Sequence, residues 1–371
     1  MKHLTQKSIK ENNIHLVFSA LRSKDKISRI AISKKTGLSV MTVGKILDVL
    51  IKAGMVIEEK DVVPGPGRKP GTLSVLKQGR SVLILDLVGY IFRFGFLNLH
   101  FELQGDWLEY EYNHSCSYEE NLVQALDFFN ETAYSPIVKQ QLLGVGVCVP
   151  GPYYHEKDIV INELIPELDK VQLKAILKDY FGNMPIYIDQ DVSHSARYMG
   201  LYESKAKYIF YAFVGDGVGG AAYYNGALLP SEHNYSGEFG QFKMQDGKTL
   251  EAHISTANLN KVLPGFSARS RKVTLQADND ACVRYIKKVI DYLADAFCNI
   301  TWLLDPQLII LESLYLSLYP SFIRELNDVF AHAMNDRRKE YLPHIIGFTQ
   351  GGSSYKGAAQ AVMEKYLESL V

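Results

Sequence analysis

From residue 81 onward, short apolar runs alternate with segments whose apolar residues recur every three or four positions. The runs are typical of buried strands, and the longer spacing is typical of helices that cover a sheet. Strands that alternate with helices favour an α/β architecture. The pattern occurs twice, so we expect two similarly built halves. The expected elements are strands at 81–103, a helix at 118–133, a strand at 140–154, a helix at 171–182, a strand and helix at 184–203, a glycine-linked hairpin at 206–228, a long helix at 280–304 and a strand at 306–313.

The sequence offers no candidate for a membrane span or a secretory signal. The longest apolar stretch, residues 81–99, contains Asp86 and Arg93, whereas a span needs about 20 mostly apolar residues. The first 20 residues have no uninterrupted apolar run after their charges. The four cysteines are far apart and lack metal-ligand spacing, which favours buried or free thiols in a reducing compartment. We therefore expect a cytoplasmic protein, and its length of 371 residues predicts two or three domains.

Charge is distributed unevenly along the chain. Residues 1–75 contain 14 Lys and Arg against 6 Asp and Glu, whereas the remainder contains 26 against 35. A basic head is thus joined to an acidic body, an asymmetry that points toward nucleic acid. A lysine-rich face exposed to solvent would give the same composition, so charge alone leaves both interpretations open.

The basic head contains the pattern of a helix-turn-helix. Ser28 is placed to cap a first helix, Gly37 to form a turn of positive φ, and Ser39 to cap a second helix through Thr42. The buried stripe expected on the second helix is Val43, Ile46, Leu47 and Leu50. The face expected to be exposed is Val40, Met41, Gly44 and Lys45.

The segments on either side complete a winged helix-turn-helix. A preceding helix, roughly Lys7 to Leu21, offers apolar residues for a three-helix core: Ile9, Ile14, Val17, Phe18 and Leu21. Residues 55–77 predict two strands around a Pro- and Gly-rich tip, with Arg68 placed to enter an A·T-rich minor groove. A plain helical hairpin and a plain loop are the alternatives. The expected DNA contacts are Ser39, Val40, Met41, Thr42, Lys45, Arg68 and Lys69.

Six motifs in the body, taken in order, resemble the ROK family of sugar kinases and sugar-responsive repressors. They are LGVGVCVPGPY, YIDQDVSHSA, GDGVGGAAYYNGAL, SGEFGQ, LEAHIS and YKGAAQAV. The resemblance implies an actin-like fold of two lobes, and it is the repressor branch that carries a winged head. We accordingly place the DNA-binding head at 1–78 and the body at 79–371. The lobes are expected at about 79–190 plus the C-terminal helix, and at 191–355.

The turns that hold ATP phosphates in the resembled kinases are altered here. The first normally contains Asp-x-Gly-Gly-Thr, but this chain has Val88 for the first Gly and Tyr90 for the Thr. The second normally contains Gly-Thr-Gly, but Asp216 replaces the Thr and would repel a phosphate. The third, near the adenosine, has no glycine in residues 309–320. These departures predict that ATP does not bind. The alternative, in which Asp216 merely caps a hairpin turn, also includes no bound nucleotide.

The zinc motif of the resembled family is also missing. Gln241 stands where the family has a His, and the run of cysteines that follows in the family is absent. His233 and His253 lie nearby, but two isolated histidines are more often surface or core residues. We predict no metal.

The resemblance leaves a sugar pocket without a phosphate donor. Asp191 matches the residue that accepts the proton of the sugar hydroxyl in kinases, and Glu238 and Glu251 match carboxylates that bind other hydroxyls. Gln190 and Ser193 depart from the family's asparagines beside that Asp, which leaves the identity of the sugar open. These acids could instead be ordinary loop residues. The complete set of expected effector contacts is Asn162, Gln190, Asp191, Glu238, Gln241 and Glu251.

These expectations combine into a repressor that releases DNA when a sugar or sugar derivative binds, with no catalytic residue. It would act as a homo-oligomer on a palindromic, A·T-rich operator of double-stranded DNA. A sugar kinase with an appended head and a DNA-binding protein whose body only dimerises are the alternatives. ATP binding would favour the first of these, and indifference to every sugar the second.

Overall fold

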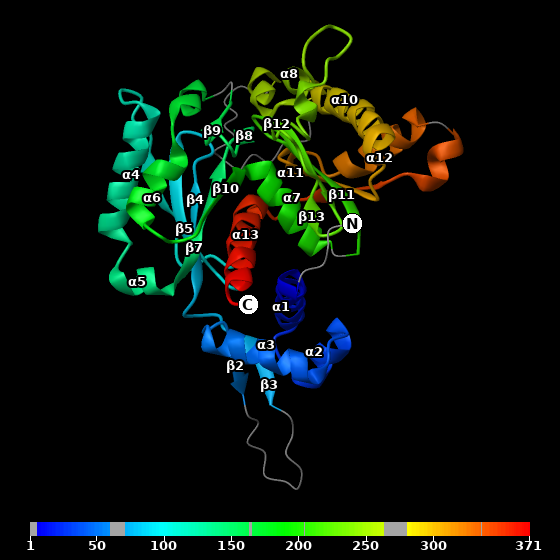
Figure 1. Cartoon of the computed structure of the whole chain (residues 1–371). Helices are drawn as coiled ribbons and strands as arrows, with labels where there is room; N and C mark the ends of the chain where they lie inside the picture. Colours follow the sequence, from blue (N-terminus) through cyan, green and yellow to red (C-terminus); the bar gives the residue numbers. More distant parts are fainter. Residues whose placement is uncertain (1–5, 60–70, 163–164, 204, 263–279, 335) are drawn as a thin grey trace. The chain divides into compact units, whose positions relative to one another are not determined.

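The computed structural model describes residues 6–59, 71–162, 165–203, 205–262, 280–334 and 336–371. Its contacts divide the chain into two compact units (Figure 1). Unit 1 comprises Met1–Asp189 together with Ala358–Val371, and unit 2 comprises Gln190–Gly357. The chain therefore passes from one unit to the other twice.

The N-terminal part of unit 1 is a winged helix-turn-helix. Ser28 Oγ accepts a hydrogen bond from Ala31 N and begins the first helix of the pair, and Gly37 ends that helix at a φ of 73°. Residues 60–70, the expected wing tip with Arg68 and Lys69, lie outside the described residues. The elements of the head are α1 (Gln6–Arg22), β1 (Ile27–Ser28), α2 (Arg29–Thr36), α3 (Val40–Lys52), β2 (Val56–Glu59) and β3 (Thr72–Val75).

The three head helices enclose a small core. The expected stripe of α3 is fully or almost fully buried, as are the expected residues of α1 except one. Ile9 is 46% exposed, so the prediction that it joins the core was wrong. The reason is length: α1 has 17 residues and α2 only 8, and the buried part of α1 begins at Ile14. The sheet β1-β3-β2 closes the core and adds a strand, β1, that the sequence pattern did not indicate.

The rest of unit 1 is built on a five-stranded sheet of order β10-β7-β4-β5-β6. Its central strand β4 is buried along its whole length, as a continuous apolar run predicts. The strands are β4 (Ser81–Asp86), β5 (Ile91–Asn98), β6 (Leu108–Glu111), β7 (Leu142–Val149) and β10 (Ile186–Gln190), with a small hairpin of β8 (Tyr153–Tyr154) and β9 (Ile159–Val160). The helices are α4 (Tyr118–Thr132), α5 (Pro136–Gln141), η1 (Pro166–Lys170) and α6 (Leu173–Phe181).

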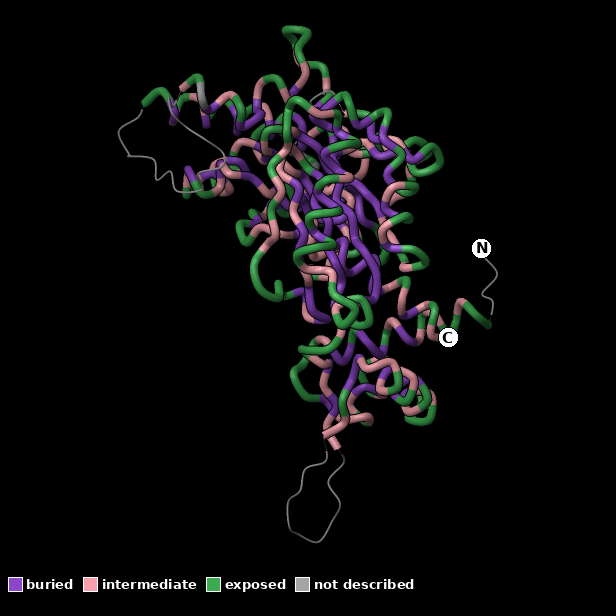
Figure 2. The backbone as a smooth tube through the Cα atoms, turned by 90° about the vertical axis from the view of Figure 1, so that its left-hand side faces the viewer, coloured by how far each residue is buried: buried purple, intermediate pink, exposed green. Residues whose placement is uncertain are grey.

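Helices cover both faces of this sheet. In Figure 1, α4 and α6 lie along one face and α13 (Ser353–Ser369) lies along the other. Close approach of α13 depends on glycines of β7, because a Cβ at Gly144 would lie 2.7 Å from Val362 Cγ1 and one at Gly146 would lie 3.0 Å from Ala358 Cβ. Figure 2 shows the resulting burial, with purple strands beneath helices whose outer faces are green.

Unit 2 contains a second five-stranded sheet, of order β13-β12-β11-β14-β15. Its strands are β11 (Tyr208–Val214), β12 (Val218–Tyr224), β13 (Ala227–Leu228), β14 (Leu308–Ser313) and β15 (His344–Phe348). Its helices are α7 (Asp191–Tyr202), η2 (Phe239–Gln241), α8 (Leu250–Ile254), η3 (Thr256–Asn258), α9 (Leu259–Val262), α10 (Asp280–Leu304), α11 (Tyr315–Leu318), α12 (Phe322–Ala333) and η4 (Asp336–Tyr341).

The two sheets share one topology. When the strands of each five-stranded sheet are numbered along the chain, the spatial order is 3-2-1-4-5 in both. Strands 1 and 2 form an antiparallel hairpin, and strand 4 lies parallel to strand 1 on its other side. In unit 2, α7 covers one face and α10 and α12 cover the other. The expectation of two similarly built halves is therefore confirmed.

In the described part of the chain, no helix is long and apolar enough to cross a membrane. The cysteines, all of which lie there, form no disulfide.

Candidate functional site

The N-terminal turn of α3 exposes apolar side chains. Val40 is 51% exposed and Met41 is 74% exposed, although apolar residues of this size are usually covered in a stable core. Lys45 follows one turn later and is also exposed. Ser39 Oγ accepts a hydrogen bond from Thr42 N at 3.1 Å and lies 2.9 Å from Thr42 Oγ1, so both hydroxyls fix the start of the helix. The exposed face expected from the sequence is present.

An ion pair and hydrogen bonds hold α2 and α3 within unit 1. Arg29 of α2 pairs with Glu58 of β2 at 2.9 Å, and so ties the base of the wing to the helix pair. At the other end of α3, Arg80 Nε donates to the carbonyl of Ala53 at 3.1 Å, and its Nη1 donates to the carbonyl of Gln140 at 3.1 Å. Arg80, the residue before β4, therefore links the end of α3 to α5.

Three of the expected sugar contacts come together in unit 2. Burial, and then the carboxylates of Asp191 and Glu251, raise the pKa of Glu238 to about 7. This effect requires Asp191 and Glu251 each to lie near Glu238, although the three acids come from separate segments. The cluster of Asp191, Glu238 and Glu251 is hereafter called the acid cluster.

Two members of the acid cluster accept hydrogen bonds from backbone N–H groups. Asp191 is the first residue of α7, and its Oδ1 accepts from Val192 N at 2.8 Å. Glu251 lies on α8, and its Oε2 accepts from Val218 N at 2.7 Å. Glu238 follows Gly237, whose φ of 99° suits glycine. These contacts fix the side-chain orientations of Asp191 and Glu251.

The other expected effector contacts lie in different settings. Gln190 is buried at the end of β10, next to Asp191, and Gln241 is exposed at the end of η2. Asn162 belongs to unit 1, where its Nδ2 donates to Gly151 O at 2.8 Å and its Oδ1 accepts from Ile165 N at 3.2 Å. The amide of Asn162 thus holds a local turn in unit 1.

The glycine turn between β11 and β12 is fixed by protein groups. Gly215 N donates to Gly217 O at 2.9 Å, and the side chain of Asp216 accepts from Thr256 Oγ1 at 2.8 Å. Ser255 Oγ donates to the Asp216 carbonyl at 2.8 Å. Asp216 therefore has a structural role in this turn, which agrees with the interpretation that it forms a hairpin.

The glycine-free segment after β14 closes against the same turn. Tyr315 is fully buried, and its hydroxyl donates to Ile254 O at 2.9 Å and lies 3.3 Å from Ser255 O. Its ring is parallel to that of Phe322, at 5.8 Å. Sequence reasoning noted the absence of glycine but missed Tyr315; the run of Leu and Tyr residues at 314–319 was the available signal for a packed helical turn.

The corresponding turn of unit 1, after β4, is held by charge and by aromatic rings. Arg93 lies opposite Asp86 in the hairpin register, and the two side chains form an ion pair at 3.4 Å. Asp86 Oδ1 also accepts from Val88 N at 3.0 Å. The ring of Tyr90 lies 5.1 Å from the ring centroids of both Tyr112 and His114. The hairpin pattern in the sequence could have revealed the Asp86 and Arg93 pair.

Neither ATP nor zinc fits the residues at these positions. The Tyr90 ring and the Asp216 carboxylate stand where the resembled kinases present a threonine to phosphate, and the buried Tyr315 replaces a glycine-rich loop. No group of three His, Cys, Asp or Glu suited to a metal occurs in the described residues. His253 Nε2 lies 3.1 Å from Asp246 Oδ1, and its ring stacks on Tyr292. The absence of both cofactors stays a prediction.

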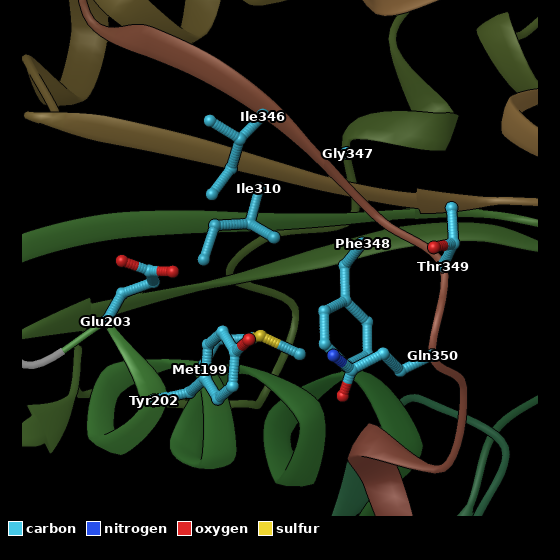
Figure 3. A pocket seen from close by; sticks show the side chains of 9 residues that line it. All are labelled: Met199, Tyr202, Glu203, Ile310, Ile346, Gly347, Phe348, Thr349 and Gln350. Carbon is cyan, nitrogen blue, oxygen red and sulfur yellow. The ribbon is translucent and has the colours of Figure 1, made fainter. Parts of the chain in front are cut away.

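A shallow hollow of about 170 Å³ lies elsewhere in unit 2, between α7 and the edge strand β15 (Figure 3). Met199 and Tyr202 line it from α7, and Ile346 and Phe348 line it from β15. None of the expected site residues faces it.

Curated relatives of this chain include repressors. The xylose repressor of Bacillus spizizenii is 23% identical over 387 residues, which cover 98% of each protein. The xylose repressor of Caldicellulosiruptor bescii is 30% identical over 240 residues, which cover 62% of this chain but only 58% of that protein.

Solved structures share the fold. A ROK family transcriptional regulator, described as a homologue of the E. coli MLC protein, has a TM-score of 0.75 at 18% identity and covers 98% of both chains. A ROK family glucokinase from Streptomyces griseus, in complex with glucose and AMPPNP, has a TM-score of 0.62 at 13% identity and covers 76% of this chain and 98% of its own.

The sequence model of the ROK family matches residues 99–362. The expected fold, a winged helix-turn-helix followed by a two-lobed actin-like domain, is confirmed, and the chain belongs to the ROK family, in its repressor branch.

Proposed function

We propose that this protein is a DNA-binding transcriptional repressor that a sugar releases from its operator. The observation that carries the proposal is the presence, in one chain, of an exposed reading face on α3 and of the acid cluster in unit 2. The relatives named xylose repressors support both parts. A ligand shifts DNA affinity only through its different affinity for the two states of the protein.

The proposed effector is an uncharged aldose, with D-xylose as the first compound to test. Carboxylates that are already close enough to raise the pKa of Glu238 would repel the phosphate of a sugar phosphate. Hydroxyl groups, in contrast, donate hydrogen bonds to carboxylates and lose little when water is displaced. Gln190 and Gln241 would add amide contacts to the ring. Asn162, whose amide holds a turn in unit 1, would act through that turn.

On DNA, α3 would enter the major groove with Val40 and Met41 against thymine methyl groups and Lys45 against guanine or phosphate. Arg68 and Lys69 would follow the minor groove of an A·T-rich, palindromic operator bound by a homodimer or tetramer. We keep the boundary between head and body at residues 78 and 79. The protein would work without ATP or zinc, in the cytoplasm.

The decisive experiment is fluorescence anisotropy on DNA from upstream of the gene, at fixed salt, with and without D-xylose. We expect Met41→Ala to weaken specific binding about 5- to 10-fold, because each good base contact contributes about 1–3 kcal/mol. Ile137→Ala is the matched control, since Ile137 is 70% exposed on α5. Asp191→Asn should retain operator affinity within about 3-fold yet need far more sugar for release.

The outcomes separate the candidate functions. Release by D-xylose or another neutral sugar supports the proposal, and release by sugar phosphates alone contradicts the role of the acid cluster. Specific binding that no sugar changes favours a body that only oligomerises. Phosphate transfer from ATP to a sugar would restore the alternative of a kinase with a DNA-binding head.

A further inference from the structure

The chain changes units at the end of β10, just before α7, and again within α13, and these two helices are neighbours. The first change falls between Asp189 and Gln190, immediately before α7, and the second falls between Gly357 and Ala358, within the second turn of α13. The helices touch through the backbone, because a Cβ at Gly357 would lie 1.7 Å from the carbonyl oxygen of His194. The first turn of α13 therefore belongs to unit 2, while the rest of the helix packs in unit 1.

A buried chain of hydrogen bonds joins these two helices beside the acid cluster. Ser195 Oγ donates to the carbonyl of Asp191 at 2.9 Å and lies 2.9 Å from Ser353 Oγ. Ser353 Oγ donates to Glu312 Oε2 at 2.7 Å, and the hydroxyl of Tyr211 donates to the same oxygen at 3.0 Å. Ser195 and Ser353 are both buried. Sequence reasoning missed this group, since its members lie up to 158 residues apart.

The hydrogens available do not satisfy all of these contacts at once. As a carboxylate, Glu312 supplies no hydrogen. The Tyr211 hydroxyl also lies 3.5 Å from Ser353 Oγ, so the hydroxyls of Tyr211, Ser195 and Ser353 supply three hydrogens for five contacts. Ser353 favours the charged acceptor Glu312. The Ser195 hydroxyl consequently donates its one hydrogen either to the Asp191 carbonyl on its own helix or to Ser353 Oγ on α13.

The far part of α13 leads toward the DNA-binding head. Within unit 1 it packs on β7 through Gly144 and Gly146. Near its C-terminus, Glu368 Oε1 lies 3.6 Å from His15 Nε2 of α1. A single continuous helix thus begins at the serine pair and ends at the first helix of the head.

We propose that Ser353 is a positioning residue that couples the acid cluster to the orientation of α13, through Ser195 and the carbonyl of Asp191. The inference rests on the proposed response to sugar. It adds the route by which that response reaches the DNA-binding head. When a sugar engages Asp191, the first turn of α7 adjusts, and Ser195 changes the acceptor that it uses. The first turn of α13 then follows α7, and the helix passes the change to α1.

The test compares Ser353→Ala with Ser354→Ala, a matched control on the same turn whose side chain is partly exposed. The operator affinity of the full-length protein is measured without and with saturating D-xylose. The ratio of the two affinities measures the coupling between sugar binding and DNA binding. We expect Ser353→Ala to reduce that ratio at least about 5-fold, with operator affinity in the absence of sugar and direct xylose affinity each within about 3-fold of wild type. Ser354→Ala should behave as wild type.

A double variant separates coupling from simple loss of packing. If Ser195 and Ser353 act as a pair, Ser195→Ala combined with Ser353→Ala loses no more coupling than either single variant. An unchanged ratio in Ser353→Ala, or independent losses that multiply in the double variant, would overturn the proposal.

Amide hydrogen exchange, measured without sugar or DNA, gives a second readout. It remains informative even if the proposed function is wrong. Loss of the Ser353 hydroxyl should speed exchange in the first two turns of α7 by about 5-fold or more relative to Ser354→Ala. If wild type ignores every sugar, the repressor proposal fails, yet this measurement still decides whether Ser353 holds α7. Equal exchange in the two variants would rule out the link.

Discussion

The first hairpins of the two units have the same place in the same topology but contain different chemistry. In unit 1 the turn after β4 is fixed by the Asp86 and Arg93 ion pair and is flanked by aromatic rings. In unit 2 the turn after β11 is fixed by hydroxyl donors to Asp216. In each case protein groups bond to the acid of the turn. The comparison teaches that strand order sets where a turn lies, while a few side chains decide what it can bind.

The two hairpins also differ in what surrounds them. The unit 2 hairpin is bonded to a residue of the acid cluster, through Val218 N and Glu251. The segment with Glu238 crosses the same hairpin, because a Cβ at Gly237 would lie 2.0 Å from Gly220 O. Unit 2 thus uses its turn as a frame for the proposed sugar site.

The largest expected effect on stability is at Gly237, where the segment with Glu238 crosses the unit 2 hairpin. Gly237→Ala should lower the free energy of unfolding by about 3 kcal/mol or more, because the new methyl group meets backbone at a positive φ. The control is Gly219→Ala on β12, where the nearest atom to a Cβ is 3.6 Å away, and it should cost less than about 1 kcal/mol. Urea unfolding measures both, and equal losses would contradict the crossing.

The second prediction compares the two anchoring acids. Asp86→Ala should cost about 2 kcal/mol, because it leaves a partly buried Arg93 without this partner. Asp216→Ala should cost about 1 kcal/mol, since an exposed residue loses one hydrogen bond from Thr256. A larger loss of stability for Asp216→Ala than for Asp86→Ala, by the same urea titration, would show that the ion pair is not the main stabilising interaction of the unit 1 turn.

The third prediction concerns pH. The pKa of Glu238 is raised to about 7 from an ordinary value of 4.5, so the unfolded state loses this proton first. Its contribution to stability therefore falls as pH rises from about 4.5 to about 7, and it stays low above that. Glu238→Gln should remove this loss and be more stable than wild type by about 1–2 kcal/mol at pH 8. At pH 4 the advantage should vanish, and thermal unfolding at both pH values checks it. An advantage that does not change with pH would contradict the acid cluster.

The smallest expected effect is no effect at all. A variant with Val88→Gly, Tyr90→Thr and Asp216→Thr restores the residues that the family's kinases use in both turns. We expect ATP with magnesium to raise its melting temperature by less than about 1 °C, since Tyr315 still fills the third position. A shift of several degrees would mean that the turns alone excluded ATP.

Local patterns in the sequence were sufficient for most of the fold. The caps at Ser28 and Ser39, the turn at Gly37 and the apolar stripe of α3 depend on neighbours within a few residues, and each is present as expected. Ile9 shows where such reasoning fails, because helical spacing gives no information on where a partner helix ends. The proximity of the three acids followed only from the resemblance to a family, since no local pattern joins residues 191, 238 and 251.

The sequence by itself determined the class of fold, the basic head with its exposed helix face, and the loss of the residues that hold phosphate and zinc in related proteins. These features follow from side-chain type, spacing and local backbone preference. Only the tertiary structure decided that Tyr315 closes the third loop, and that Ser195, Ser353 and Glu312 meet beside Asp191. Such contacts join strands and helices that are distant along the chain, and packing of whole elements sets their geometry.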